Sequence, residues 1–586
     1  MELMRDFSIQ CKDHRACVTV TPLESQEEIE LYRITVRFFQ KEIPPTVTIC
    51  WEEKMKGLLH VWHPLTGCRH TMHQSWHANR SESCFHCGAP ILCTVGEGGA
   101  NGRTVALSDP NTPSSLRFSI EDLKQEDTVA YSAVLFDGAC DAVEQYEVLL
   151  RIDSRSIPYD LAVQEVYTWW ADNGSPIPAP PAAAEDATYS TWYNFHQEPR
   201  QDILLEELKI AARLGFKTVI LDDGWQIEGV SKGDYANCGA WTVSKDRFPN
   251  FKGFCQAVHR LGMKLAVWFA VPFVGVESPV YTEFKGKYLQ EANESVTHGI
   301  LDPRFPEVRG YIRSNYERFL QEYDIDGFKL DYVDAFAVRG EIPAYDPSLM
   351  DCETVGDAVL RLLEEIQSGL GAIKTDLLYE YRQRYVGPAI NRFGNMLRVG
   401  DCAYDAHINR VEMVNLRLLG YPVAIHSDML FWSPEESERL CARQLLNILF
   451  AVPQISVRLT ESKQEQRELL AAYLSYWTKH RERILHGRFR AYHPEQNFTR
   501  ITAEDETGVI SVLHGDFPYI WDGRHAHVHH NGDCEGLLVE NPTDDRLRVR
   551  LSMCFGAREI GLYEVCPHTI VRLPLPPTGM AEIESV

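Results

Sequence analysis

The feature that most constrains this chain is a regular alternation of strand-like and helix-like segments between Tyr189 and Leu459. Eight apolar or β-branched runs recur there, separated by amphipathic stretches such as 202–214 (DILLEELKIAARL). The runs are STWYNF at 190, KTVILD at 217, KLAVWFAV at 264, DGFKLD at 326, DLLYEY at 376, NMLRVGD at 395, VAIHSDML at 423 and AVPQISVRL at 451. Strands separated by helices pair in parallel, so eight of them predict a (β/α)8 TIM barrel. A doubly wound open sheet is the alternative, but no glycine-rich nucleotide-binding turn follows any run.

The flanking segments predict two further domains. A chain of 586 residues is too long for one hydrophobic core. Residues 1–170 contain short alternating runs such as 31–39 (LYRITVRFF), which predict an N-terminal β-sandwich. A Pro/Ala-rich linker then leads into the catalytic barrel at 185–485. Short strands within 490–586 predict a small C-terminal β-sandwich.

Composition narrows the classes of partner and location. The chain is 44% hydrophobic and 24% charged, which is typical of globular proteins and excludes long disorder. A net charge of −25 disfavours nucleic-acid and anionic-membrane partners, because both attract basic surfaces. No run of 18 apolar residues and no N-terminal apolar leader is visible, so we expect a cytoplasmic protein whose cysteines are reduced.

Ionisable residues stand where several of the predicted strands end, which is where barrels carry their catalytic groups. Asp222 and Asp223 follow KTVIL, with Trp225 close behind, and suit the binding of sugar hydroxyls. In DGFKLD, the period of two places Lys329 and Asp331 on one face of the strand. Burying the charges of a lysine and an aspartate inside a barrel costs free energy, so such residues are expected to be paired and to have a function.

The next strand ends add a second carboxylate and an aromatic platform. The sixth run closes with Arg398 and Asp401, and the third carries Trp268. Carboxylates on two different strands suit glycoside cleavage, which needs an acid for the leaving oxygen and a base or nucleophile at the anomeric carbon. The alternative is that each aspartate only caps the helix that follows its strand, and Asp405 is a second candidate for the acid.

Four motifs, STWYNFH, ILDDGWQ, GFKLD and RVGD, make the chain resemble the melibiase-type α-galactosidases of glycoside hydrolase family 36, which are related to raffinose synthases. The resemblance covers most of the chain and implies that Asp331 is the nucleophile and Asp401 the acid/base. It also implies that Asp222 and Asp223 hold the 4- and 6-hydroxyls of galactose. That family needs no metal or cofactor, and its members often form homo-oligomers.

The resemblance also implies details of the mechanism. The family retains anomeric configuration, so a covalent glycosyl–Asp331 intermediate is expected, with the two carboxyls roughly 5–5.5 Å apart. Lys329, which falls beside the nucleophile, is expected to keep Asp331 ionised. Trp268 falls at the pocket tryptophan. Asp401 is expected to have a raised pKa, so that it enters the cycle protonated.

The chain departs from the family on the side of the sugar that carries C2. The usual CSGGG segment, which contacts the 2-hydroxyl, reads EYRQR at 380–384, and the arginine before the LD segment is replaced within ESVTH at 294–298. Arg382 and Gln383 are candidates to replace the lost contacts, and Arg398 is a further candidate for substrate binding. The departures leave an N-acetylated, glucosyl or charged sugar open.

We therefore expect a retaining exo-α-galactosidase acting on small carbohydrates of the melibiose or raffinose type. Two enzyme alternatives are an α-galactosyl transglycosylase of the raffinose-synthase type and an α-glycosidase for another sugar, such as N-acetylgalactosamine. A catalytically silent sugar-binding protein is the alternative from another class. The presence of both Asp331 and Asp401 speaks against it, because a lectin needs no acid/base.

A cluster of cysteines and histidines between 68 and 93 raises the question of a zinc site. Its CxxC, CFHC at 84–87, could hold zinc if two further ligands converged. The other spacings match no standard zinc module, so scattered reduced cysteines are the preferred interpretation and no metal is predicted. The cluster comprises Cys68, His70, His73, His77, Cys84, His86, Cys87 and Cys93.

Overall fold

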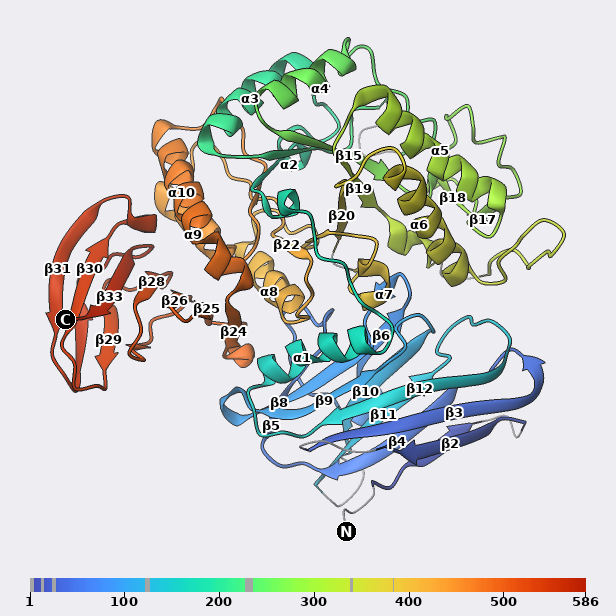
Figure 1. Cartoon of the computed structure of the whole chain (residues 1–586), viewed down its shortest axis with the longest axis horizontal. Coiled ribbons are helices and arrows are strands. Elements are labelled where there is room, and N and C mark those ends of the chain that lie inside the picture. The colour runs from blue at the N-terminus through green and yellow to red at the C-terminus, as the bar shows by residue number, and fades with distance from the viewer. Residues whose placement is uncertain are drawn as a thin grey trace.

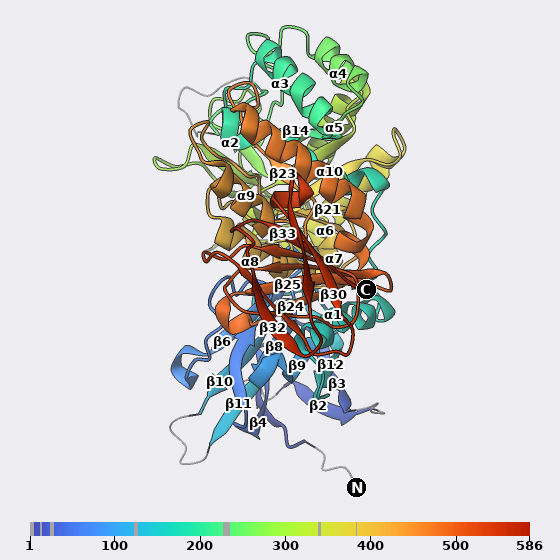
Figure 2. The same cartoon turned by 90° about the vertical axis from the view of Figure 1, so that its left-hand side faces the viewer.

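The computed structural model describes residues 5–11, 15–23, 28–121, 127–226, 235–337, 341–382 and 384–586. It has three parts in chain order: two packed β-sheets, a parallel barrel surrounded by helices, and a smaller pair of sheets (Figure 1). Figure 2 shows the N-terminal sheets at one end of the barrel and the C-terminal sheets along its side. The predicted combination of a central (β/α)8 barrel with a β-sandwich on each side is confirmed.

The N-terminal part is a sandwich of two six-stranded antiparallel sheets. One sheet contains, in order, β1 (Ser8–Cys11), β4 (Val47–Lys54), β11 (Thr128–Leu135), β10 (Ser114–Ile120), β6 (Asn79–Cys84) and β7 (Cys87–Gly88). The other contains β2 (Cys17–Pro22), β3 (Ile29–Glu42), β12 (Val143–Asp153), β9 (Asn101–Leu107), β8 (Ile91–Gly96) and β5 (Leu58–Trp62). Alternate residues of the strands face a shared core, in which Trp51 and Tyr131 stack with ring centroids 5.5 Å apart. Helix α1 (Tyr159–Asp172) then leads toward the barrel.

The barrel consists of eight parallel strands. In chain order they are β13 (Thr188–Ser190), β14 (Thr218–Leu221), β15 (Lys264–Ala270), β19 (Gly327–Asp331), β20 (Leu378–Arg382), β21 (Met396–Arg398), β22 (Ala424–His426) and β23 (Gln454–Ile455). The ring closes next to β23, where the Val452 amide donates to the Ile425 carbonyl at 2.8 Å. All eight predicted runs therefore contribute a strand.

The first of these runs is only partly a strand. STWYNF was predicted to be extended throughout, but β13 ends at Ser190, and α2 (Trp192–Phe195) follows as one helical turn. Thr191 already has helical dihedral angles, and its hydroxyl accepts a hydrogen bond from the Asp222 amide at 3.0 Å. This tertiary contact overrides the strand preference of the aromatic residues.

Helices of the expected amphipathic kind pack around the barrel (Figure 1). The predicted helix at 202–214 is α3 (Gln201–Leu214), which buries Leu204, Leu208 and Ala211 and ends at Gly215 with φ of 114°. A left-handed residue after the last turn favours glycine. The others are α4 (Phe251–Arg260), α5 (Pro306–Tyr323), α6 (Val355–Gly371), α7 (Pro388–Asn391), α8 (Ala406–Arg417), α9 (Glu438–Asn447) and α10 (Gln464–His486). A small sheet of β16 (Phe273–Gly275), β17 (Tyr288–Gln290) and β18 (His298–Leu301) follows β15.

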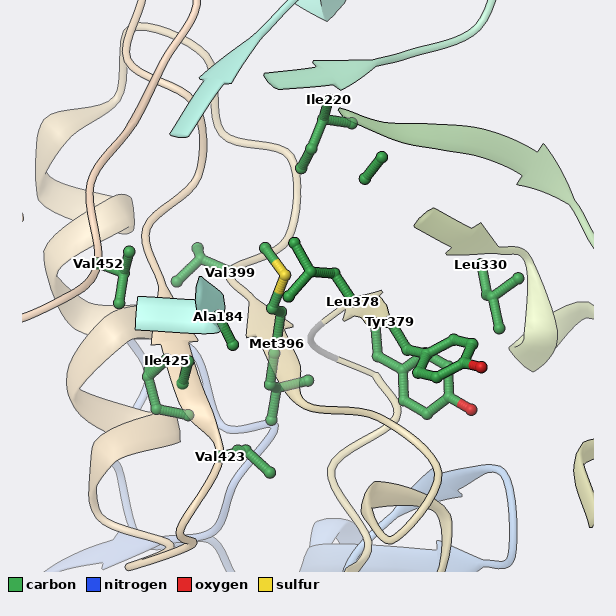
Figure 3. Close-up of a cluster of buried hydrophobic side chains, with 14 of the residues drawn as sticks. Ala184, Ile220, Leu330, Leu378, Tyr379, Met396, Val399, Val423, Ile425 and Val452 are labelled. Carbon is green, nitrogen blue, oxygen red and sulfur yellow. The ribbon is translucent and has the colours of Figure 1, made fainter. Parts of the chain in front are cut away.

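The barrel strands and helices share one large hydrophobic core. Figure 3 shows a cluster within it, with side chains contributed by β14, β19, β20, β21 and β22. Each fully buried aliphatic side chain of this kind contributes roughly 1.5–3 kcal/mol to folding. The residues labelled there are Ala184, Ile220, Leu330, Leu378, Tyr379, Met396, Val399, Val423, Ile425 and Val452.

The C-terminal part again has two sheets. The larger contains, in order, β24 (Arg488–Tyr492), β25 (Arg500–Asp505), β26 (Gly508–Leu513), β28 (Ala526–His530), β33 (Met580–Ser585), β30 (Leu547–Ser552) and β31 (Glu559–Val565). The smaller contains β27 (Tyr519–Ile520), β29 (Leu537–Asn541) and β32 (Thr569–Leu573). Within the described ranges, no helix combines the length and the apolar character needed to cross a membrane.

Candidate active site

Side chains from adjacent parallel strands meet near the carboxyl end of the barrel. The strand register places Trp268 beside Lys329, and Lys329 beside Glu380. Because side chains alternate along a strand, Asp331 and Arg382, each two residues further on, project on the same face as these neighbours. The fold thus converts residues far apart in sequence into one layered polar cluster.

Asp331 is held by three donors from three directions. One carboxylate oxygen, Oδ2, accepts from the indole N–H of Trp268 at 2.9 Å. The other, Oδ1, accepts from the Tyr332 amide at 2.9 Å and lies 2.8 Å from Nε of Arg382. Tyr332 adopts a left-handed φ of 62°, which is strained for a bulky residue. Its phenol contacts the hydroxyl of Tyr235 at 2.7 Å, so packing holds this conformation and fixes the orientation of the Asp331 carboxylate.

Lys329 has a different partner from the one expected. Its Nζ donates to Oδ2 of Asp222 at 2.6 Å, and both side chains are almost completely buried. Burial acts to lower the pKa of Lys329, but the negative charges of Asp222, Asp331 and Glu380 together outweigh burial and raise that pKa above its usual value. The closest cation to Asp331 is instead Arg382, and the expectation that Lys329 helps to keep Asp331 ionised stays a prediction.

Asp223 is buried beside Asp222 and held by two amides. Its Oδ2 accepts from Nε2 of Gln197 at 2.6 Å, and its Oδ1 accepts from Nε2 of Gln226. Burial raises the pKa of Asp223 to about 6, although these hydrogen bonds act in the opposite direction. Asp223 therefore changes its charge close to physiological pH.

Arg382 lies between the two candidate catalytic carboxylates. Its Nε is 2.8 Å from Asp331, its Nη1 is 3.6 Å from Asp401, and its Nη2 is 3.9 Å from Asp334. The guanidinium also stacks over the ring of Tyr332, 5.0 Å from its centroid. One cation thus bridges Asp331 at the end of β19, Asp334 just after it, and Asp401 in the loop after β21.

Asp401 lies on a loop that two buried residues, Arg398 and Asp428, hold in place. Arg398 is completely buried, donates to Oδ1 of Asp401 at 2.9 Å, and pairs with the equally buried Asp428. Asp428 also accepts from the Cys402 amide at 2.7 Å, which ties the loop to β22. The Asp401 side chain itself is 49% exposed, so it faces the open end of the barrel.

The charge state of Asp401 differs from the one expected for a resting general acid. Partial burial would raise its pKa, but Arg398, Lys329 and Arg382 together lower the pKa of Asp401 to about 2. Asp401 is therefore ionised at neutral pH, and the expectation of a raised pKa is wrong. The cause is the cations that surround it, two of which lie within 4 Å.

Two of the remaining predicted residues lie wholly in the interior. Trp225 is completely buried, and its indole N–H donates to the Trp268 carbonyl at 2.9 Å. Arg398 is equally buried beneath Asp401. Gln383 lies outside the described residues. Asp405, the other candidate acid, caps α8 by accepting from the Ile408 amide at 2.9 Å.

Sequence reasoning missed two carboxylates that support the site. Glu380 is 1% exposed, and Nε of Arg398 lies 3.5 Å from it. Asp428 accepts from the Tyr193 hydroxyl at 2.8 Å in addition to its contacts with Arg398 and the loop. The alternation in LLYEYR places Glu380 on the face of Arg382, and the end of VAIHSDML points to Asp428, so the same rule could have found both.

The cysteines and histidines between 68 and 93 do not converge on a common point. In the described part of the chain, one group brings three ligand atoms within 4.8 Å of one another, and it lies in the C-terminal domain: His525, His527 and Glu582. Sγ of Cys84 lies 4.0 Å from Nε2 of His86, but among the described residues no third ligand atom lies within 4.8 Å of both. The zinc site considered at 68–93 therefore has no geometric support.

The sequence comparison with known protein families matches part of the barrel. Residues 187–373 match the Melibiase family model. Alpha-galactosidase Mel36A of Lactobacillus acidophilus is 29% identical over 147 residues, which is 24% of this chain and 19% of that protein. The A type blood alpha-D-galactosamine galactosaminidase of Flavonifractor plautii is 26% identical over 178 residues, 27% of this chain and 16% of that protein. The alignments thus span less than a fifth of the length of either relative.

Solved structures extend the similarity to the whole chain. One similar structure is a variant of the GH36 alpha-galactosidase AgaA of Geobacillus stearothermophilus in complex with raffinose. It superposes with a TM-score of 0.65 at 14% sequence identity, and the match covers 99% of this chain and 87% of that one. The alpha-galactosidase of Lactobacillus brevis gives 0.64 at 12%, covering 100% and 86%. Identities this low establish a common fold only. Residues 187–373 are therefore similar to the Melibiase family, and the chain as a whole has a fold like that of the GH36 α-galactosidases.

Proposed function

We propose that this protein is a retaining exo-α-galactosidase that hydrolyses terminal α-galactosides of the melibiose or raffinose type. The observation that carries the proposal is the pair Asp331 and Asp401, which come from different strand ends and contact the same guanidinium, at 2.8 and 3.6 Å. Two carboxylates on opposite sides of a scissile bond are what glycoside hydrolysis requires. The raffinose complex of the structurally similar AgaA variant supports the substrate class.

In the proposed mechanism, Asp331 attacks the anomeric carbon and Asp401 protonates the departing oxygen. The hydrogen bonds from Trp268 and the Tyr332 amide keep the carboxylate in one orientation, so little reorganisation precedes attack. The covalent glycosyl–Asp331 ester is then hydrolysed by water, with Asp401 as the base. Asp222 and Asp223 accept hydrogen bonds from hydroxyls of the bound sugar.

The position of Arg382 requires one further step. In the proposed mechanism, the bound sugar takes the place of the guanidinium between the two carboxylates, while Trp268 and the Tyr332 amide keep their contacts with Asp331. Moving this cation away from Asp401 raises the pKa of Asp401, because one of the charges that lower it is withdrawn. Binding of substrate would therefore help to bring the acid into its protonated form.

A second candidate function is an α-glycosidase for a different sugar. Arg382 favours this candidate. Arg382 stands in the segment that replaces the family's CSGGG, on the side expected to face C2. An N-acetyl or other acceptor group there could bind the guanidinium, and the galactosaminidase among the relatives makes this group worth testing.

Hydrolysis of a panel of p-nitrophenyl α-glycosides tests both proposals, with and without an acceptor sugar. We expect the α-galactoside to be cleaved fastest, with the α-anomer of galactose as first product by NMR. Faster cleavage of the N-acetylgalactosaminide would favour the second candidate. Transfer to the acceptor in preference to water would identify a transglycosylase, and no turnover of any glycoside would contradict the proposal altogether.

A further inference from the structure

Three histidines alternate along one strand of the C-terminal domain. His525, His527 and His529 occupy every second position at and just before β28, in the sequence HAHVHH at 525–530. The strand period of two places them on one face of the sheet. Helix α10 covers this face: the ring centroid of Tyr476 is 5.0 Å from that of His529, and the centroid of His480 is 4.8 Å from that of His527. An imidazole-rich surface thus lies between the helix and the sheet.

The neighbouring strand adds a carboxylate at the same point. Glu582 of β33 lies directly opposite His527 in the antiparallel register. Its Oε1 is 3.2 Å from Nε2 of His525 and 3.8 Å from Nε2 of His527. We propose that His525, His527 and Glu582 form a binding site for a divalent transition-metal ion of the zinc class. Two imidazoles and one carboxylate are a set that zinc accepts, with further positions left for water.

The surroundings orient these ligand atoms toward one another. The hydroxyl of Tyr476 lies 2.9 Å from Nδ1 of His527, which leaves Nε2 free to face the metal. Arg550 lies 3.6 Å from Oε2 of Glu582, so Oε1 is the oxygen left for the ion.

The site is also accessible, and its place in the fold indicates a structural role. The side chains of His525 and Glu582 are 34% and 32% exposed, so an ion can enter from solvent. An ion there would link β28 to β33 and, through Tyr476, both strands to α10, the helix that leads from the barrel into this domain (Figure 1). This role is independent of the sugar site, because none of its residues contacts Asp331 or Asp401.

Metal titration of the full chain, purified without a histidine tag and kept reduced, tests the proposal. We expect one equivalent of Zn²⁺ to bind by calorimetry, and Co²⁺ to give d–d absorption without a thiolate charge-transfer band. His525→Ala and Glu582→Gln should each weaken binding at least 100-fold, and Tyr476→Phe roughly 10- to 100-fold, as is usual for residues that orient a ligand. The matched control is His568→Ala, because His568 forms a similar pair with Asp544, 2.9 Å away, outside the cluster. It should leave affinity unchanged.

Each contrary result would overturn the proposal in its own way. Unchanged affinity in His525→Ala and Glu582→Gln, with circular dichroism like that of the parent, would place the ion elsewhere. A thiolate band would assign it to cysteines, and failure of the parent to bind one equivalent would remove the site. Because both substituted residues are partly exposed, the variants are expected to fold, and the metal readout does not depend on glycosidase activity.

Discussion

Replacing Asp401 by alanine should affect catalysis and hardly affect stability, and the contacts of its neighbours explain why. After the substitution, Arg398 keeps Asp428 and Glu380, and Arg382 keeps Asp331, so no buried cation is left unpaired. The lost ion pairs involve a side chain that is 49% exposed, and such pairs contribute at most about 1 kcal/mol. Stability should therefore fall by less than about 1 kcal/mol.

Catalysis should fall by an amount that depends on the leaving group. A positioned general acid contributes roughly 10²- to 10⁴-fold, or about 3–5 kcal/mol of barrier, when the departing oxygen belongs to a sugar. An activated dinitrophenolate needs little protonation, so Asp401→Ala should lose far less activity on dinitrophenyl α-galactoside than on melibiose. With the activated substrate the glycosyl enzyme should accumulate as a burst, and azide should relieve it with retained configuration.

The matched control is Asp405→Ala, four residues away. It removes the cap of α8 at the Ile408 amide and should cost about 0.5–2 kcal/mol of stability. Its kcat/KM should fall equally, if at all, on both substrates. The assay is the ratio of kcat/KM for the two substrates, measured beside thermal unfolding. A ratio that stays at the parent value in Asp401→Ala, or that changes in Asp405→Ala, refutes the assignment.

Three further changes address the other groups of the site. Asp331→Ala should lower turnover by many orders of magnitude, because it removes the proposed nucleophile, and added azide should give a glycosyl azide of inverted configuration. Retention of more than about a tenth of the parent rate would exclude this role. Because the pKa of Asp223 is about 6, kcat/KM should decline as the pH falls below 6, where the Asp223 carboxylate loses its charge. Asp223→Asn should abolish this pH dependence and lower kcat/KM about 10- to 100-fold. A decline that persists in the variant would point to another group. Arg382→Gln withdraws a positive charge 3.6 Å from Asp401, so the pKa of Asp401 should rise from about 2 toward its ordinary value. The alkaline limb of the melibiose profile should then move to higher pH, and a limb that stays in place would mean that Arg382 does not act on the acid.

Much of the architecture and part of the site could be predicted from local patterns. The alternation of strands and helices predicts a parallel sheet with both faces covered, and the eight strand-like runs predict that the sheet closes into a barrel. The period of two places Lys329 and Asp331 on one face, and the rule that barrel sites form at strand ends selects Asp222 and Asp401. Both kinds of signal are encoded within a few residues, so a single sequence shows them.

Only the tertiary structure determines which charged side chains form ion pairs with one another. Lys329 is two residues from Asp331 yet pairs with Asp222, more than one hundred positions away, and Trp225 turns into the core. Arg382 reaches both catalytic candidates and, with Arg398 and Lys329, makes Asp401 far more acidic than its proposed role suggests. A pKa depends on burial and on distances to charges, and these are set by how separate strands are brought together. Sequence periodicity tells which way a side chain points, but the partner it finds there depends on the closed barrel.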